Sequence, residues 1–299
     1  MKAEINKNND NTYDPRLAPA GSLWGEVVRR FFKNKIAVAS LALFLIICLA
    51  CLFAPYLTKY EYYGINIAIR SSRPSFQHLL GTDVLGRDNL TRMLYGGRLT
   101  LKITFLSTII AAAIGSILGL AAGYAGKKAD YIISPVLDLL AAVPVVLLSI
   151  VCETIFGWGK GYFMYAIAVA SVPKLARFVR ASVLEVMGRE YIEAARALGV
   201  SHVGVIFRHV VHNVAPSFIV RLTSSAAEAL VTCTIMGYLS IGISPPTPEW
   251  GQIAHNAKAY MRVAPFMMLI PCIVIAVTVL SLSLFGDGLR DALDPNEAS

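Results

Sequence analysis

The sequence is poor in charged residues, which make up only 15% of its 299 positions. Soluble domains carry about 25%, so these side chains are too few to cover the surface of a water-soluble globule. Hydrophobic residues instead reach 56%, and the mean hydropathy is +0.60. The composition therefore excludes an ordinary soluble protein and indicates a chain that lies in a lipid bilayer.

Acidic residues are scarcer than basic ones, with 19 Asp and Glu against 27 Lys and Arg. A basic surplus can indicate a nucleic-acid-binding protein. Here, however, no basic run is interleaved with aromatic residues, and the Lys and Arg residues flank apolar segments, as is typical of chains oriented in a bilayer. We therefore expect membrane lipid, and no nucleic acid, as a partner.

Motifs for chemistry are missing as well. A phosphate-binding loop needs G-x-x-x-x-G-K-[ST], but the sequence around Gly126 and Lys127 has Ala121 and Lys128 at the flanking positions. The sequence contains no HExxH and no GxSxG. All five cysteines lie in or beside apolar runs without metal-site spacing, which is typical of small buried residues. We expect no catalytic residue, no bound metal and no cofactor in this chain.

Long apolar segments dominate what is present. A bilayer core needs about 20 apolar residues of helix, and the polar first 35 residues are not typical of a cleaved signal peptide. The sequence predicts an all-α fold, a polytopic transmembrane helical bundle. Its six predicted spans are residues 36–57, 103–124, 132–152, 161–173, 215–236 and 264–285.

Two of these spans are irregular. The third is interrupted by Pro135, Asp138 and Pro144, and the fourth is short enough to need Lys174 and Arg177 as snorkelling ends. In the second, Gly115, Gly119 and Gly123 recur every four residues, which lets two helix backbones approach closely. We expect that close contact either within the bundle or with a partner subunit.

An even number of spans puts both termini on one side of the membrane. Lys and Arg are more numerous on that side than in the other loops, so it is predicted to be the cytoplasm. The predicted organisation is a cytoplasmic segment (1–35), a first transmembrane helix (36–57), an extracytoplasmic loop (58–100), a five-span core (101–286) with a cytoplasmic loop at 174–213, and a cytoplasmic tail (287–299).

The cytoplasmic loop contains a charged helical hairpin, REYIEAARALGVSHVGVIFRHVVHNVAPS, at residues 189–217. Gly199 is expected to end its first helix with a positive φ, and Ser201 to cap the second. Ala194 and Ala195 keep the first helix slim, and Glu193 can pair with Arg196 across a turn. Such a helix suits the groove of another protein, although an ordinary surface hairpin is the alternative.

The hairpin resembles the EAA loop of permease subunits in bacterial ABC importers. Four further segments resemble the dipeptide, oligopeptide and nickel branch of that family in the same order. The five segments are HLLGTDVLGRDNLTRMLYGGRLTL (78–101), GYAGKKADYIISPVLD (123–138), ARFVRASVLEVMGREYIEAARALG (176–199), PPTPEWG (245–251) and LFGDGLRDALDP (284–295).

The resemblance implies the second, or C-type, permease of an ATP-driven importer in a bacterial or archaeal inner or plasma membrane. The implied partners are a second permease, two cytoplasmic P-loop ATPase subunits that bind ATP and Mg, and an extracytoplasmic substrate-binding protein. In that family the loop is a coupling helix that sits in a cleft of the ATPase. The residues expected to couple are Glu193, Ala194, Ala195, Arg196, Leu198 and Gly199.

The cargo and the path residues are left open by the sequence. Asp138, Arg221 and Glu228 are charges in predicted spans, where each costs about 3 kcal/mol or more, so they should face protein or water. Asp138, Glu228 and Cys233 are the candidate pathway or gating positions, and Glu228 suits a cationic or zwitterionic cargo or a partner subunit. Cys233 and Gly237 depart from the family pattern. Di- or oligopeptides are the expected cargo, with nickel or a metal chelate second and a proton-coupled secondary transporter as a further alternative.

Overall fold

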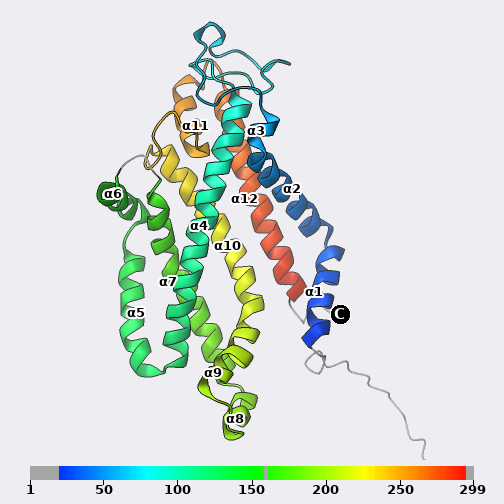
Figure 1. The fold of residues 1–299 in the computed structure, drawn as a ribbon, viewed down its shortest axis with the longest axis vertical. Helices are drawn as coiled ribbons and strands as arrows, with labels where there is room; N and C mark the ends of the chain where they lie inside the picture. Colours follow the sequence, from blue (N-terminus) through cyan, green and yellow to red (C-terminus); the bar gives the residue numbers. More distant parts are fainter. Residues whose placement is uncertain (1–19, 158–160, 294–299) are drawn as a thin grey trace, which may run out of the picture.

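A computed structural model describes residues 20–157 and 161–293 as a long bundle of helices (Figure 1). The described residues contain no strand, only an isolated bridge between Thr82 and Asp88, which confirms the all-α prediction. The helices are α1 (Ala20–Lys33), α2 (Lys35–Leu52), α3 (Ala54–Leu57), α4 (Asn89–Tyr124), α5 (Lys127–Ala142), α6 (Val145–Phe156), α7 (Phe163–Met187), α8 (Glu190–Ala197), α9 (His202–Gly204), α10 (Val211–Tyr238), α11 (Trp250–Ala257) and α12 (Phe266–Leu293). Two short 3-10 helices, η2 (Ile67–Ile69) and η4 (Lys258–Tyr260), and a π-helical segment, η3 (Val205–Val210), are also present.

Helix boundaries follow local sequence signals. Asn34 separates α1 from α2, and its side chain accepts hydrogen bonds from the backbone N–H groups of Ile36 and Ala37, each at 3.1 Å. Asp88 caps α4 in the same way through Thr91. Because Asp88 starts the helix, α4 begins well before the predicted span at residue 103 and extends that span into the predicted extracytoplasmic loop.

The six predicted spans are only partly matched. Within the described residues, four helices are long and apolar enough to cross a membrane, namely α2, α4, the continuous helix from His202 to Tyr238, and α12. A fifth is counted if α5 and α6 form one span. Helix α7 is long, but Lys174, Arg177 and Arg180 keep it below the apolar character of a simple span.

The third predicted span is not one straight helix. Helices α5 and α6 meet at an angle of 89° at Val143 and Pro144. Proline lacks a backbone N–H and disfavours helix in the residue before it, so Pro144 starts α6 as its cap rather than continuing α5. The interruption expected in the span over residues 132–152 is therefore a sharp bend, and α5 and α6 count as one span only if the bent pair is taken together.

The glycines of α4 pack against α7 of the same chain. A methyl group added at Gly115 would lie 2.9 Å from Cβ of Leu175, and one added at Gly123 would lie 2.9 Å from Cβ of Val183. At Gly119 it would collide with the carbonyl oxygen of Ala176. These contacts decide between the two alternatives for the glycine stripe, because the close neighbour lies within the bundle.

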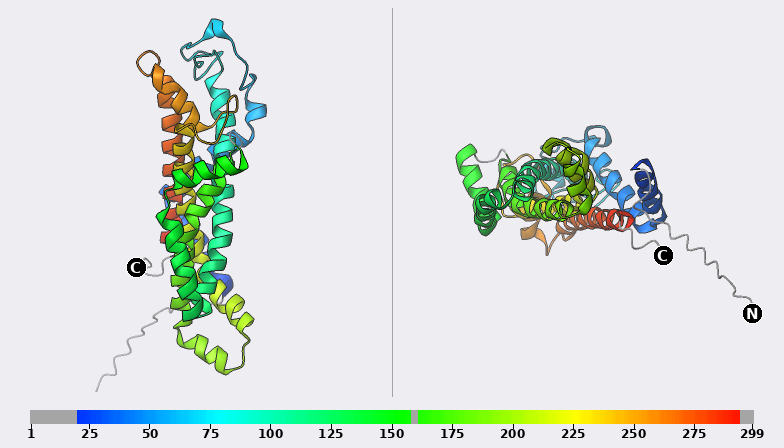
Figure 2. Two further views of the ribbon diagram at one scale, coloured as in Figure 1. Left: turned by 90° about the vertical axis from the view of Figure 1, so that its left-hand side faces the viewer. Right: turned by 90° about the horizontal axis from the view of Figure 1, so that it is seen from below.

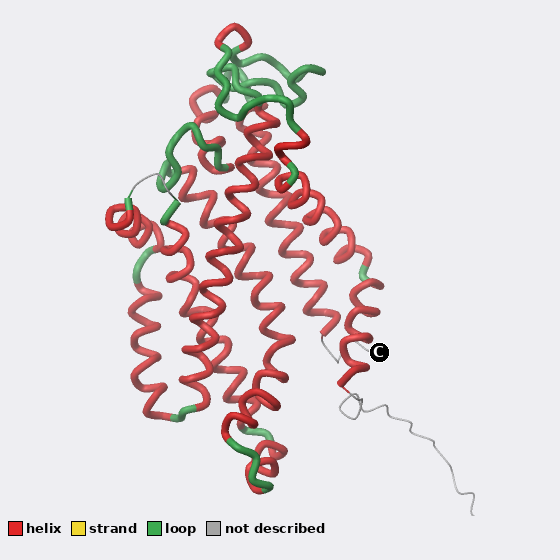
Figure 3. The backbone as a smooth tube through the Cα atoms, in the orientation of Figure 1, coloured by secondary structure: helices red, strands yellow, loops and turns green. Residues whose placement is uncertain are grey.

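The two ends of the bundle differ. One end carries the irregular segment between α3 and α4 together with α11, whereas α8 and α9 project beyond the helices at the other end (Figures 1 and 3). Figure 2 shows the same projection from the side. The second arm of this hairpin continues into α10 through η3 without a break, so Pro216 lies inside a helix and does not begin one.

Candidate functional site

The projecting hairpin is held to the bundle by apolar side chains on one face of α8. Ile192 is fully buried and Ala195 nearly so, and Ile192 packs in a cluster with Val179, Val183 and Val205. Val200 donates its backbone N–H to the carbonyl of Ala195 at 3.1 Å. The hairpin is therefore a fixed structural element, since its inward face has the packing of a protein core.

Residues on the opposite face of the hairpin are exposed. Glu193, Ala194, Arg196 and Leu198 all point away from the buried face, whereas Ala195 points into it. Gly199 has a φ of +82°, which confirms the predicted left-handed end of the helix. The predicted cap is also present, because Ser201 accepts a hydrogen bond from the backbone of Gly204 at 3.2 Å.

Arg196 has a different neighbour from the one expected. Its guanidinium lies 5.9 Å from the ring centroid of Tyr124, and no ion pair joins it to Glu193. The Tyr124 hydroxyl lies 2.9 Å from Nδ1 of His202. Tyr124 at the end of α4 thus connects both arms of the hairpin to the bundle, and Glu193 is left without that ion pair.

The hairpin exposes apolar side chains, of which the sequence analysis singled out only Leu198. Leu198 is 86% exposed, and Val203 and Phe207 are also largely exposed. Val203 and Phe207 are four positions apart, the spacing that places two residues on one helix face, and this spacing was the available signal. All three exposed apolar side chains lie on a segment that faces water by the predicted topology.

Charged side chains on α7 form ion pairs with two neighbouring helices. Lys174 donates to Glu228 on α10 at 2.6 Å, and Arg177 donates to Asp138 on α5 at 2.7 Å. Arg180 also bonds Asp130 on α5 at 2.6 Å. Asp138 and Glu228, both predicted as pathway or gating positions, are thus about half exposed or more and are neutralised within the chain.

Polar residues form a stripe along α10. They recur at intervals of three or four positions, so they lie on one face of the helix. The stripe consists of Ser217, Arg221, Ser224, Glu228 and Thr232, none of which is buried. Arg221 Nη2 lies 3.8 Å from Glu228 Oε1, which agrees with the expectation that these two charges point the same way.

Cys233 lies away from this stripe. It is fully buried in a cluster with Ile103, Phe163 and Ile167. A fully buried thiol with apolar neighbours is a packing residue, and it does not reach the polar stripe of α10.

A buried carboxylate at the other end of the bundle was not singled out by the sequence. Glu249 caps α11, accepts the backbone N–H of Gln252 at 2.9 Å, and accepts the Thr100 hydroxyl at 2.9 Å. A methyl group added at Gly237 would collide with the Glu249 carboxylate. Gly237, noted as a departure from the family pattern, thus makes room for Glu249.

Metal-binding groups are not gathered anywhere in the described residues, where no three His, Cys, Asp or Glu side chains lie close enough to hold an ion. His209 and His212, three positions apart in the sequence, are partly or fully exposed.

Comparisons with known proteins cover most of the chain. Residues 115–298 match the family of binding-protein-dependent transport system inner membrane components, and residues 22–76 match the N-terminal transmembrane domain of oligopeptide transport permease C. The chain is 37% identical to the dipeptide transport system permease protein of Alkalihalophilus pseudofirmus, over 94% of this chain and 92% of the relative. It is 38% identical to the glutathione transport system permease protein of Pectobacterium atrosepticum, over 91% of both.

A solved structure is also similar. An inward-facing form of the MetNI methionine ABC transporter matches with a TM-score of 0.51 and 22% identity, over 64% of this chain and 92% of that chain. At this identity the similarity concerns the fold alone, and it shows that the helices of the two chains are similarly arranged.

Proposed function

The chain belongs to the family of binding-protein-dependent transport system inner membrane components, and from this premise we propose that it is the membrane-spanning half of an ATP-driven importer. Its partners are a second permease, two cytoplasmic P-loop ATPase subunits and an extracytoplasmic substrate-binding protein. ATP and Mg bind to the ATPase subunits. Both termini and the hairpin lie in the cytoplasm, and the loop between α3 and α4 lies outside.

The observation that carries this proposal is the hairpin. It combines a rigid packed face with an exposed surface of Leu198, Val203 and Glu193 at the extreme end of the molecule. A rigid element with an exposed apolar anchor and charged edge is suited to a groove in a partner protein. Because α10 continues directly from the hairpin, motion of an ATPase groove would be transmitted along α10 into the membrane.

The polar stripe of α10 supports a path on the same helix. Charged and hydroxyl side chains cost free energy in contact with lipid, yet Glu228 and Lys174 are about half exposed in the isolated chain. Facing the second permease across a water-filled path would cover this surface. We assign the path to the side of α10 that carries Arg221 and Glu228, with Asp138 holding α5 to α7.

Small peptides are the proposed cargo. The relatives named above transport dipeptide and glutathione by their names, and both match nearly the whole length of the chain. Nickel or a metal chelate is the second candidate. In such systems the substrate-binding protein makes most of the selection, so cargo identity is tested on the complete transporter.

Two exposed hairpin positions test the proposed coupling. Leu198→Asp and Glu193→Lys should reduce recovery of the ATPase subunits with the tagged permease at least about tenfold, because a central interface anchor contributes about 2 kcal/mol or more. Val263→Asp is the matched control, since Val263 is 83% exposed but lies in the segment between α11 and α12. It should leave recovery unchanged.

Membrane insertion of all three variants should remain normal, because exposed substitutions usually change stability by less than about 0.5 kcal/mol. Normal ATPase recovery and uptake with both hairpin variants would refute the docking role and leave only a surface hairpin.

A further inference from the structure

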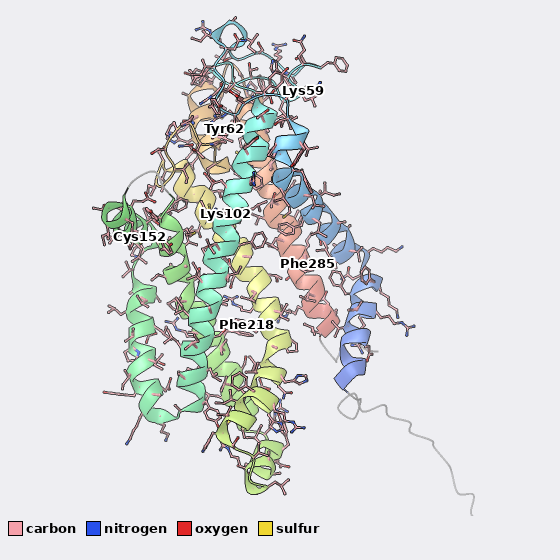
Figure 4. All side chains as sticks on the ribbon, in the orientation of Figure 1. Lys59, Tyr62, Lys102, Cys152, Phe218 and Phe285 are labelled. Atoms are coloured by element: carbon pink, nitrogen blue, oxygen red, sulfur yellow. The ribbon has the colours of Figure 1, made fainter. Side chains whose placement is uncertain are left out.

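A cavity of about 660 Å³ opens between α7, α10 and α12, on the half of the bundle nearer the hairpin. Three residues of the α10 stripe line it, so it lies on the face that we assign to the path. Figure 4 marks this level of α10 with Phe218. The lining residues are Lys174, Phe178, Ser217, Val220, Arg221, Ser224, Asp287, Arg290 and Leu293.

Cations outnumber carboxylates around this cavity. Lys174, Arg221 and Arg290 come from three different helices, and Asp287 is the one carboxylate in the lining. Glu228 lies just beyond and serves two of the cations, at 2.6 Å from Lys174 and 3.8 Å from Arg221. Counting both carboxylates, one positive charge remains uncompensated.

Arg290 is the cation that supplies this surplus. It is exposed, it stands at the end of α12, and none of the described residues lies within ion-pairing distance of it. Hydroxyl groups of Ser217 and Ser224 line the same cavity and are able to donate hydrogen bonds. Guanidinium, ammonium and hydroxyl donors around one opening are the groups that bind a carboxylate.

This arrangement changes the role expected of Glu228. On sequence alone, a carboxylate in the span suits the ammonium group of a cargo. In the structure the Glu228 carboxylate is already paired with Lys174. An ammonium group of a cargo would therefore meet three cations in the cavity. An entering carboxylate, by contrast, removes the surplus positive charge.

We propose that this cavity is a vestibule near the cytoplasmic end of the path that binds the terminal carboxylate of a peptide as it leaves the transporter, with Arg290 and Arg221 as the main donors. The proposal rests on the proposed importer function and adds the chemical group that the path recognises. It concerns the cytoplasmic side, so it is separate from selection by the external binding protein.

The test measures inhibition from the cytoplasmic side. The complete transporter is reconstituted in vesicles with its cytoplasmic face outward, the binding protein and labelled tri-alanine are enclosed, and ATP is added outside. Unlabelled tri-alanine or tri-alanine amide is then added outside, where it reaches the vestibule without the binding protein. Tri-alanine should inhibit release about tenfold more strongly than the amide, because only the acid offers a charge-assisted bond.

Substitutions of the arginines test whether the difference between acid and amide arises in this cavity. Arg290→Gln and Arg221→Gln should each bring inhibition by the acid close to that by the amide, whereas Arg290→Lys should retain most of the difference. Arg262→Gln is the control, since Arg262 is also exposed but lies between α11 and α12, and it should retain the full difference.

Equal inhibition by acid and amide in the unmodified transporter, or an unchanged difference in both glutamine variants, would overturn the carboxylate site. A loss of transport in Arg290→Gln that occurs only in phosphatidylglycerol vesicles, with inhibition by tri-alanine unchanged, would assign the cavity to lipid phosphate and also overturn it. Absence of ATP-driven tri-alanine release from the unmodified complex would contradict the peptide cargo itself, and this inference with it.

Discussion

Glu249 shows how one side chain joins three parts of the fold. Its carboxylate is completely buried between Thr100 of α4, the backbone of α11 and the close approach of Gly237 on α10. Burial raises the pKa of Glu249 from 4.5 to about 7, although hydrogen bonds from the backbone and from Thr100 act in the opposite direction. The neutral carboxyl is therefore favoured in the folded state relative to the unfolded chain.

The pH dependence of stability follows from this raised pKa. Between pH 4.5 and about 7 the folded state binds more protons at Glu249 than the unfolded state, so the free energy of unfolding falls as pH rises through this window and levels off above it. Thermal unfolding in detergent should show that the melting temperature of the wild type falls relative to Glu249→Gln between pH 5 and pH 7.5. Parallel curves for the two proteins would contradict the raised pKa. Glu190→Gln, at an exposed position, should follow the wild type.

At the scale of the helices, packing depends on three glycines of α4, Gly115, Gly119 and Gly123. The three glycines bring its backbone against α7, and this contact positions the row of cations on α7 opposite α5 and α10. Small residues at this spacing stabilise helix association in membranes through close packing rather than through the hydrophobic effect. The packing of α4 against α7 therefore positions both the hairpin and the ion pairs of α7.

A single methyl group tests this frame. Gly119→Ala should destabilise the chain by about 1–3 kcal/mol, because the added Cβ meets the Ala176 carbonyl and one backbone must move. Gly25→Ala is the matched control on α1, where nothing lies within 4 Å of the added group. It should be neutral or stabilising by up to about 1 kcal/mol. Thermal or denaturant unfolding in detergent compares the two, and equal stabilities would contradict the close α4–α7 contact.

The whole molecule has two structurally different ends, an irregular segment at one and a helical hairpin at the other. The segment between α3 and α4 carries exposed Phe76 and lies at the end opposite to the hairpin with Leu198. Between them lie four apolar spans, or five with the bent α5–α6 pair, within the residues that the structure describes. The length of α4 alone, 36 residues, exceeds the roughly 20 needed to cross the bilayer core, so part of this helix extends beyond the core.

Opposite ends should be reached from opposite sides of the membrane. In a cysteine-free background, Phe76→Cys should react with a membrane-impermeant thiol reagent in intact cells, whereas Leu198→Cys should react only after the cells are opened. Both positions are well exposed, so accessibility is decided by the membrane. Labelling of both cysteines in intact cells would contradict the predicted topology.

The sequence by itself determined the class of fold, the apolar segments and the local geometry of the hairpin. A bilayer requires long apolar helices whatever they pack against. Gly199 and Ser201 set the conformation of the backbone next to them. Short stretches of sequence are therefore enough to predict these features. Pairing and bending were decided only by tertiary structure. Whether Glu228 meets Lys174, a cargo or a partner subunit depends on residues 54 positions apart. Pro144 marks a break in the sequence, but the 89° angle between α5 and α6 is a property of the folded chain. The buried site of Glu249 needed α4, α10 and α11 to come together, because burial is a property of the assembled bundle and no single segment contains it.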